Sequence, residues 1–139
     1  MPIAPFLHQR RVHFHECDPA GIVYFAHLFT FCHEAYEELV RAGGQPLETL
    51  VGGAVVYPLR HVEADYRAPL RLGDLVTIRV SLAKLSERSF QVVYAIADRA
   101  GALLATSAAV HVAVERATMR PTAIPPEVRA VLAPYLESA

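Results

Sequence analysis

The sequence predicts an α+β fold in which one long amphipathic helix packs against an antiparallel sheet. Apolar residues recur at spacings of three and four between Tyr24 and Ala42, which is the period of a helix with one buried face. Beyond Val55, apolar and polar residues alternate in four successive segments joined by short turns, which is typical of half-buried strands. A strand pattern also precedes the helix, so five strands are expected.

The helical segment carries an apolar stripe and ends at a glycine pair. The residues of the stripe are Phe25, Leu28, Phe29, Cys32, Tyr36, Leu39 and Val40. Gly43-Gly44 ends the helix, with Pro46 just beyond it. A helix over Tyr24 to Ala42 would be roughly 28 Å long, enough to cross a five-stranded sheet.

The first expected strand runs from Phe6 to Glu16. The later strands are expected at Val55 to Arg67, with an irregularity at Pro58, and at Leu75 to Leu85, Phe90 to Ile96 and Leu104 to Val114. Asp98 to Gly101 is predicted as a hairpin turn. The segment from Pro126 to Tyr135 is predicted as a short C-terminal helix.

Composition limits the classes of function. The 139 residues predict a single domain over 1–139. Hydrophobic residues make up 53%, so part of the apolar surface is expected in contacts between subunits. The formal net charge of −1 does not indicate the basic surface that a nucleic-acid-binding protein needs.

The sequence also predicts where the protein resides. It contains no apolar run long enough to span a membrane. The stretch from Met1 to Gln9 is too short and too polar at its end for a signal peptide. Cys17 and Cys32 do not suggest a disulfide framework, so a cytoplasmic protein with free thiols is expected.

The run from His15 to Phe25 is the strongest functional signal. Asp18 follows a strand pattern and precedes a Pro/Gly turn into the helix. Its carboxylate can act as a base or a nucleophile, and the amides near Val23 to Phe25 can hold a developing oxyanion. Gly21 lets the backbone approach a ligand closely. Asp18 is also suited to an N-cap or Asx turn, but about five residues separate it from the predicted helix, which favours a functional role.

Other polar residues have weaker interpretations. His13, His15 and Cys17 would share a strand face and could ligate zinc, although no second cluster completes such a site. Cys17 is also a candidate nucleophile, whereas Cys32 lies on the apolar stripe and is predicted as a core residue.

Several side chains have open roles. His33 lies at the edge of the stripe, where it could face a pocket beside Asp18 or belong to the surface or an interface. His61 and His111 are predicted as structural strand residues. The basic residues at strand ends or loops, which could bind an anionic ligand, are Lys84, Arg88 and Arg120.

The run Asp18-Pro19-Ala20-Gly21-Ile22-Val23, preceded by an acidic residue and a cysteine, resembles the active-site run of the 4-hydroxybenzoyl-CoA thioesterase family of hot-dog-fold enzymes. The continuation to His27, and then Cys32 to Glu37, is more similar to the branch that hydrolyses 1,4-dihydroxy-2-naphthoyl-CoA. Further similarity lies at Tyr57 to His61, Tyr66 to Pro69, Gly73-Asp74 and Pro121 to Pro126. The resemblance therefore covers nearly the whole chain in order.

The resemblance implies a hot-dog fold, in which a five-stranded antiparallel sheet wraps around one long helix. It implies a homodimer with active sites at its interface, assembled into a homotetramer. It further implies hydrolysis of an aromatic acyl-CoA thioester without a metal or other cofactor. Asp18 is the implied nucleophile or general base, and the backbone at Tyr24 and Phe25 polarises the thioester carbonyl.

The implied substrate contacts divide into two sets. The acyl group is assigned to Gly21, Val23, His33, Pro58 and His61, and the CoA phosphates are assigned to Lys84, Arg88, Ser89 and Arg120. His33 stands where the 4-hydroxybenzoyl enzyme has an acid. Pro19 follows the 4-hydroxybenzoyl pattern instead of the alanine expected in the naphthoyl branch, so both substrates stay open.

Other functions remain alternatives at this stage. A short- or medium-chain acyl-CoA or acyl-carrier-protein thioesterase would use the same machinery. A non-catalytic module would bind acyl-CoA without hydrolysing it, and a metal-binding domain would use His13, His15 and Cys17. The sequence leaves open the acyl group, the nucleophilic or general-base route, the tetramer arrangement and the pathway.

Overall fold

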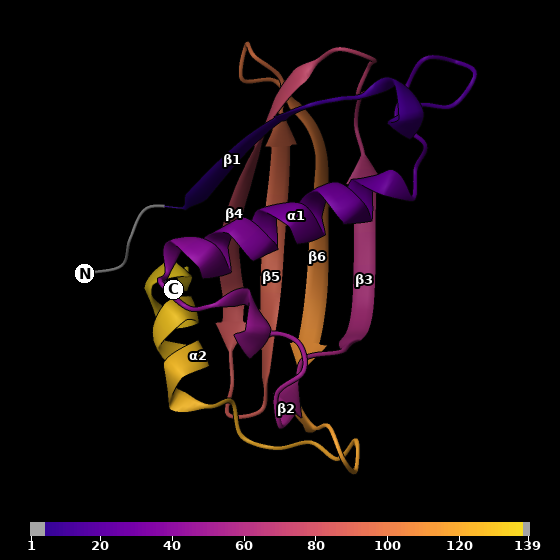
Figure 1. The fold of residues 1–139 in the computed structure, drawn as a ribbon. Helices are drawn as coiled ribbons and strands as arrows, with labels where there is room; N and C mark the ends of the chain where they lie inside the picture. The colour runs from indigo at the N-terminus through magenta and orange to yellow at the C-terminus, as the bar shows by residue number, and fades with distance from the viewer. Residues whose placement is uncertain (1–4, 138–139) are drawn as a thin grey trace.

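The computed structural model describes residues 5–137. One long helix, α1 (His27–Ala42), crosses one face of a five-stranded antiparallel sheet (Figure 1). The strands lie in the order β1 (Phe6–Arg11), β4 (Leu75–Leu85), β5 (Ser89–Ala97), β6 (Leu103–Val112) and β3 (Leu59–Tyr66). This arrangement confirms the predicted α+β class and hot-dog fold.

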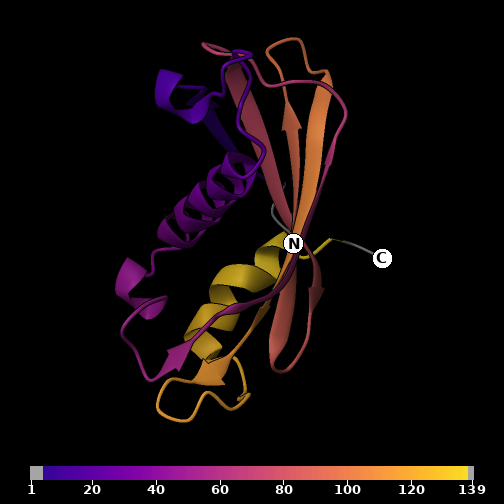
Figure 2. The ribbon, with the colours of Figure 1, turned by 90° about the vertical axis from the view of Figure 1, so that its right-hand side faces the viewer.

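Smaller elements complete the chain. A two-stranded ribbon pairs β2 (Val55–Val56) with β7 (Val114–Glu115). The 3-10 turns are η1 (Phe14–Glu16), η2 (Leu47–Thr49) and η3 (Ala133–Tyr135), and the second helix is α2 (Pro126–Leu132). Figure 2 shows α1 and α2 on the same side of the sheet. No helix within residues 5–137 is both long and apolar enough to cross a membrane.

The core lies between α1 and the sheet. The predicted inward residues of two central strands are all buried, namely Val76, Ile78, Val80, Leu82, Phe90, Val92, Tyr94 and Ile96. The buried face of α1 differs from the predicted stripe, because Phe31 and Ala35 are buried whereas Phe25 is 60% exposed. Arg10 on β1 places its guanidinium 3.7 Å from the Phe31 ring centroid, which extends burial to that side of the helix.

Strand β6 turns its smaller and more polar side chains toward the helix. Tyr94 faces the core and pairs with Ser107, so the inward set of β6 is Ala105, Ser107, Ala109 and His111. These side chains are all buried, yet most of them are small. Space is therefore left beside α1 along this strand.

The structure corrects several predicted boundaries. The first strand ends at Arg11 instead of Glu16, because residues 14–16 form a 3-10 turn. The long helix begins at His27 instead of Tyr24. The expected strand from Val55 divides into β2 and β3 near Pro58, where an irregularity was predicted. The last expected strand and the C-terminal helix each divide into two elements.

Gly43, at the end of α1, lies directly against α2. A Cβ atom at this position would lie 2.7 Å from a methyl carbon of buried Val131. We expect Gly43→Ala to lower the free energy of unfolding by about 1–3 kcal/mol, because the overpacked side chains must shift. Chemical denaturation measures this change.

Gly53→Ala provides the matched control. A Cβ at Gly53 would meet only the Val55 carbonyl oxygen, at an ordinary 3.7 Å. This variant should change the free energy of unfolding by about 0.5 kcal/mol or less. Equal stability of the two variants would contradict the packing role of Gly43.

Candidate active site

The segment after β1 folds back as a tight hairpin with the tip Asp18–Gly21. The Asp18 N–H donates to the Ile22 carbonyl at 2.9 Å. The Tyr24 N–H donates to the Glu16 carbonyl, also at 2.9 Å. Both arms are thereby held in register, and the hairpin delivers the chain to the start of α1.

Asp18 heads the turn at the tip. Its Oδ1 accepts the Ala20 N–H at 2.9 Å, and its carbonyl accepts the Gly21 N–H at 3.0 Å. Gly21 has a φ of 80°, which suits glycine. The Asx turn considered from the sequence is therefore present, and it uses one carboxylate oxygen. The other oxygen, Oδ2, accepts no hydrogen bond from residues 5–137.

The hairpin leaves one of the expected amide donors free. The Val23 N–H donates to the Leu70 carbonyl at 2.8 Å, and the Tyr24 N–H is already paired with Glu16. The Phe25 N–H has no acceptor within the described residues 5–137. The expectation of free donors along Val23 to Phe25 is therefore wrong for the first two amides and holds at Phe25. The Tyr24 ring stays at the site, with its centroid 4.8 Å from that of Phe25.

Tyr66, at the end of β3, holds the backbone at Phe25. Its hydroxyl donates to the Phe25 carbonyl, across 41 residues of sequence. The contact fixes the residue whose amide is free. The sequence did not single out Tyr66 for this role, since the pattern predicts only a strand from Val55 to Arg67 that includes it.

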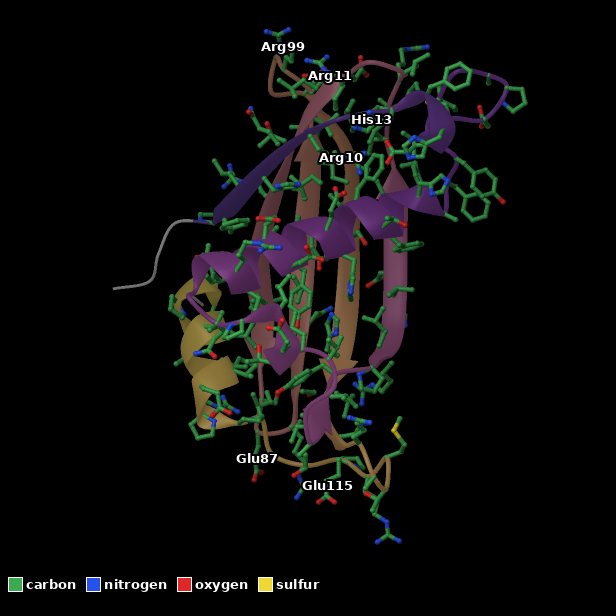
Figure 3. All side chains as sticks on the ribbon, in the orientation of Figure 1. Arg10, Arg11, His13, Glu87, Arg99 and Glu115 are labelled. Carbon is green, nitrogen blue, oxygen red and sulfur yellow. The ribbon has the colours of Figure 1, made fainter. Side chains whose placement is uncertain are left out.

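A salt bridge with two nearly buried side chains anchors the base of the hairpin. Arg10 Nη2 lies 2.6 and 2.5 Å from the two carboxylate oxygens of Glu16, and each side chain is 9% exposed. Glu16 also accepts the His13 N–H at 2.8 Å, and Arg10 Nη1 reaches Glu34 on α1 at 3.0 Å. Figure 3 shows Arg10 between β1 and α1. The network ties β1, the hairpin and the helix together.

The same network sets the ionisation of Glu16. Burial alone would raise its pKa, but the His13 N–H and the Arg10 guanidinium outweigh burial and hold the pKa below its usual value. The side chain is therefore a stable carboxylate at neutral pH. The hydrogen bond from the His13 N–H to the Glu16 carboxylate also explains why the first strand ends before Glu16, because it stabilises the 3-10 turn at residues 14–16.

The cysteine and histidine alternatives lose support. Burial, Asp18 and Glu16 raise the pKa of the Cys17 thiol, which disfavours the thiolate that a nucleophile needs. Burial raises the pKa of Cys32 to about 12, and this side chain is 3% exposed, which confirms its core role. His13 and His15 do not share a strand face, because the 3-10 turn intervenes. Within residues 5–137 no three His, Cys, Asp or Glu side chains are grouped to hold a metal ion.

The predicted acyl contacts fall into two groups. His33 lines two cavities beside α1, of about 660 and 430 Å³, and Pro58 lines the larger one. His61 instead pairs with Val110 on the sheet face away from α1 and lies 3.8 Å from Glu63. One chain thus brings His33 and Pro58 together and leaves His61 apart. Asp18 lines neither cavity.

The predicted CoA contacts lie far from Asp18 in the same chain. Lys84, Arg88 and Ser89 surround the turn between β4 and β5, and Arg120 follows β7. Figure 3 labels Glu87 and Glu115 at this end of the sheet and His13 at the opposite end. A single chain therefore does not join these residues to the Asp18 hairpin.

We expect Glu16→Gln to lower the free energy of unfolding by about 2 kcal/mol at pH 7, because it weakens two charge-assisted hydrogen bonds. The lowered pKa means that the unfolded state binds more protons in acid. The stabilisation is thus complete above the ordinary pKa of 4.5 and is lost as the pH falls through the folded value. The difference between the variant and the unmodified chain should shrink below pH 4.5 in denaturation measurements.

Glu34→Gln is the matched control, since Glu34 binds the same arginine from a side chain that is 44% exposed. Its cost should stay below about 1 kcal/mol. If both variants lose equal stability, the buried Arg10–Glu16 pair is not the anchor of the hairpin.

Comparison with known proteins agrees with this geometry. A model of the thioesterase-like superfamily matches residues 12–132. The chain is 34% identical over 125 residues to a 1,4-dihydroxy-2-naphthoyl-CoA hydrolase from Synechococcus elongatus, a match that covers 88% of this chain and 91% of the relative.

Solved structures give the same result. The 1,4-dihydroxy-2-naphthoyl-CoA thioesterase of Synechocystis superposes with a TM-score of 0.87 at 27% identity, covering 92% of this chain and 95% of the other. A gentisyl-coenzyme A thioesterase superposes with a TM-score of 0.80 at 26% identity, covering 88% and 98%. The resemblance inferred from the Asp18 run is confirmed, and the chain belongs to the thioesterase-like superfamily, as a thioester hydrolase with the hot-dog fold.

Proposed function

We propose that this protein hydrolyses an aromatic acyl-CoA thioester, of the 1,4-dihydroxy-2-naphthoyl-CoA or 4-hydroxybenzoyl-CoA type, to the free acid and CoA. The observation that carries the proposal is the hairpin, which presents a carboxylate oxygen of Asp18 and an amide at Phe25 that have no hydrogen-bond partner among residues 5–137. The names of the relatives, which act on dihydroxynaphthoyl and gentisyl thioesters, support an aromatic substrate.

In the proposed reaction the thioester oxygen accepts the Phe25 N–H, which stabilises the negative charge that develops there. Asp18 then acts by one of two routes. Its free oxygen attacks the carbonyl carbon to give a mixed anhydride and CoA thiolate, and water later hydrolyses the anhydride. Alternatively, Asp18 takes a proton from a water that attacks directly.

The proposal includes a homodimer formed through strand β3. This strand is an open edge of the sheet, and its apolar side chains Leu59, Val62 and Tyr66 are 48%, 40% and 46% exposed. An open edge with exposed apolar side chains of this kind favours pairing with another strand. Antiparallel pairing of two β3 strands would place the Tyr66 end of one copy beside the Leu59 end of the other.

Such a dimer would also explain the separation of the predicted CoA contacts. The residues Lys84, Arg88, Ser89 and Arg120 lie at the Leu59 end of the sheet, opposite the Asp18 hairpin. In the antiparallel pair, one copy would supply Asp18 and the other these basic residues. A tetramer of two dimers and a cytoplasmic location, where the free thiols of Cys17 and Cys32 would persist, belong to the same proposal.

The proposed activity is tested by thiol release from a panel of acyl-CoA esters. The panel holds dihydroxynaphthoyl, 4-hydroxybenzoyl, benzoyl, acetyl, hexanoyl and palmitoyl esters. We expect the highest kcat/KM for an aromatic ester. Preference for aliphatic esters would overturn the aromatic assignment, and binding of esters without thiol release would indicate a non-catalytic module.

Asp18→Asn keeps the size of the side chain and removes its charge. We expect it to lower kcat by about 10²–10⁴-fold while the fold and CoA binding persist. Glu48→Gln is the control, because Glu48 is an exposed carboxylate outside the hairpin and should keep full activity. An Asp18→Asn protein with normal turnover would remove Asp18 from the mechanism.

Tyr66→Phe deletes the hydroxyl that holds the Phe25 carbonyl. We expect kcat to fall about tenfold with KM nearly unchanged, because a loosened amide stabilises the transition state less well than before. Steady-state kinetics measure both constants, and the molecular mass in solution confirms that the oligomer is intact. An unchanged kcat would exclude this positioning role.

A further inference from the structure

The larger cavity beside α1, of about 660 Å³, has an aromatic inner wall. Tyr36 on the helix and His111 on β6 both line it, and their ring centroids lie 4.9 Å apart. Phe90 packs behind them, 4.9 Å from His111 with an interplanar angle of 13° and 6.2 Å from Tyr36, without lining the cavity itself. His33 lies at the margin, 6.2 Å from His111. Aromatic side chains thus form the inner boundary of a cavity large enough to admit an aromatic ring.

Two polar atoms interrupt this aromatic boundary. The Tyr36 hydroxyl and the His111 Nε2 are buried and have no hydrogen-bond partner within residues 5–137. The two side chains are only 3% and 1% exposed. An unpaired buried polar atom carries a substantial free-energy cost, so both atoms call for a partner that the described chain does not supply.

The chemistry of that partner follows from the protonation of each group. His111 Nδ1 lies 3.0 Å from the Tyr57 carbonyl, which can only accept, so Nδ1 carries the proton. Burial lowers the pKa of His111 to about 4, so the ring is neutral at pH 7 and Nε2 is an acceptor. Burial also raises the pKa of Tyr36, whose hydroxyl keeps its proton and can donate. A donor and an acceptor on two side chains that line the same cavity match a hydroxyl group.

We propose that Tyr36 and His111 determine specificity by binding a ring hydroxyl of the aromatic acyl group, at the end of the ring away from the thioester. Tyr36 donates to the hydroxyl oxygen, and the hydroxyl donates to His111 Nε2. The inference rests on the proposed function, because it assigns the acyl end of that site.

The proposed dimer connects this cavity to the hairpin. Within one chain, nine helical residues, or roughly 14 Å, separate the start of α1 from Tyr36, which is too far for one ring system. His111, however, pairs in register with Leu59 at the first residue of β3. Antiparallel pairing of two β3 strands therefore brings the Phe25 end of one copy toward the cavity of the other.

The decisive experiment compares two thioesters that differ in one hydroxyl. These are 1,4-dihydroxy-2-naphthoyl-CoA and 1-hydroxy-2-naphthoyl-CoA, which lacks only the distal group; 4-hydroxybenzoyl-CoA and benzoyl-CoA form a second pair. Tyr36→Phe should lower kcat/KM for the hydroxylated member of the preferred pair by about 10–100-fold and leave the other member within about twofold. His111→Phe should likewise reduce the ratio of kcat/KM for the hydroxylated ester to kcat/KM for the ester without the hydroxyl.

Tyr135→Phe is the matched control, because Tyr135 is a buried tyrosine that lines a different cavity, and the variant should leave kcat/KM for both esters unchanged. If His111→Phe fails to fold, the near-isosteric Tyr36→Phe still decides the question. An equal loss of kcat/KM for both esters would indicate a structural role for Tyr36 and His111. No loss for either ester would indicate that the Tyr36 hydroxyl and the His111 Nε2 bind only water. Either outcome overturns the inference. If the unmodified protein hydrolyses no aromatic ester, the proposed function itself fails.

Discussion

The placement of the Asp18 hairpin depends on one ion pair, Arg10 with Glu16. Opposite charges this far from water are stable only when their hydrogen bonds are nearly complete, and here the guanidinium also meets Glu34 and the Phe31 ring. The pair joins the edge strand, the hairpin and the helix into one rigid unit. Without it, the base of the hairpin would lose its link to β1 and α1, and only backbone contacts such as that from Val23 to Leu70 would hold the hairpin to the rest of the fold.

The architecture was largely predictable because it follows from local periodicity. The alternation in Leu75–Leu85 and in the next strand reports burial on one face, and both strands were found as expected. The alternation through His13 and His15 was misleading, since a side chain that bonds back to the main chain can end a strand without changing its polarity pattern.

The Asp18 segment of the candidate site was predictable from the sequence, whereas the residues that hold and surround it were not. The Asp18 run is a contiguous motif, so its resemblance to a family was visible in the sequence alone. The contact from the Tyr66 hydroxyl to the Phe25 carbonyl joins residues 41 positions apart, and no periodic pattern in the sequence indicates it. The buried polar atoms of Tyr36 and His111, which have no partner in the described part of the chain, arise from packing between a helix and a strand far apart in sequence. Residues of this kind become visible only when the chain is folded.

The hairpin has a consequence for how this protein can diverge. Asp18 and the segment that leads into Phe25 stand on opposite arms of one short ladder, so the separation between the proposed carboxylate and the proposed amide donor depends on the number of residues at its tip. An inserted or deleted residue there would shift one arm against the other and turn its groups to the wrong side. The proposed chemistry therefore constrains the length of the segment from Asp18 to Phe25, whereas the residues that line the proposed acyl pocket lie outside this constraint.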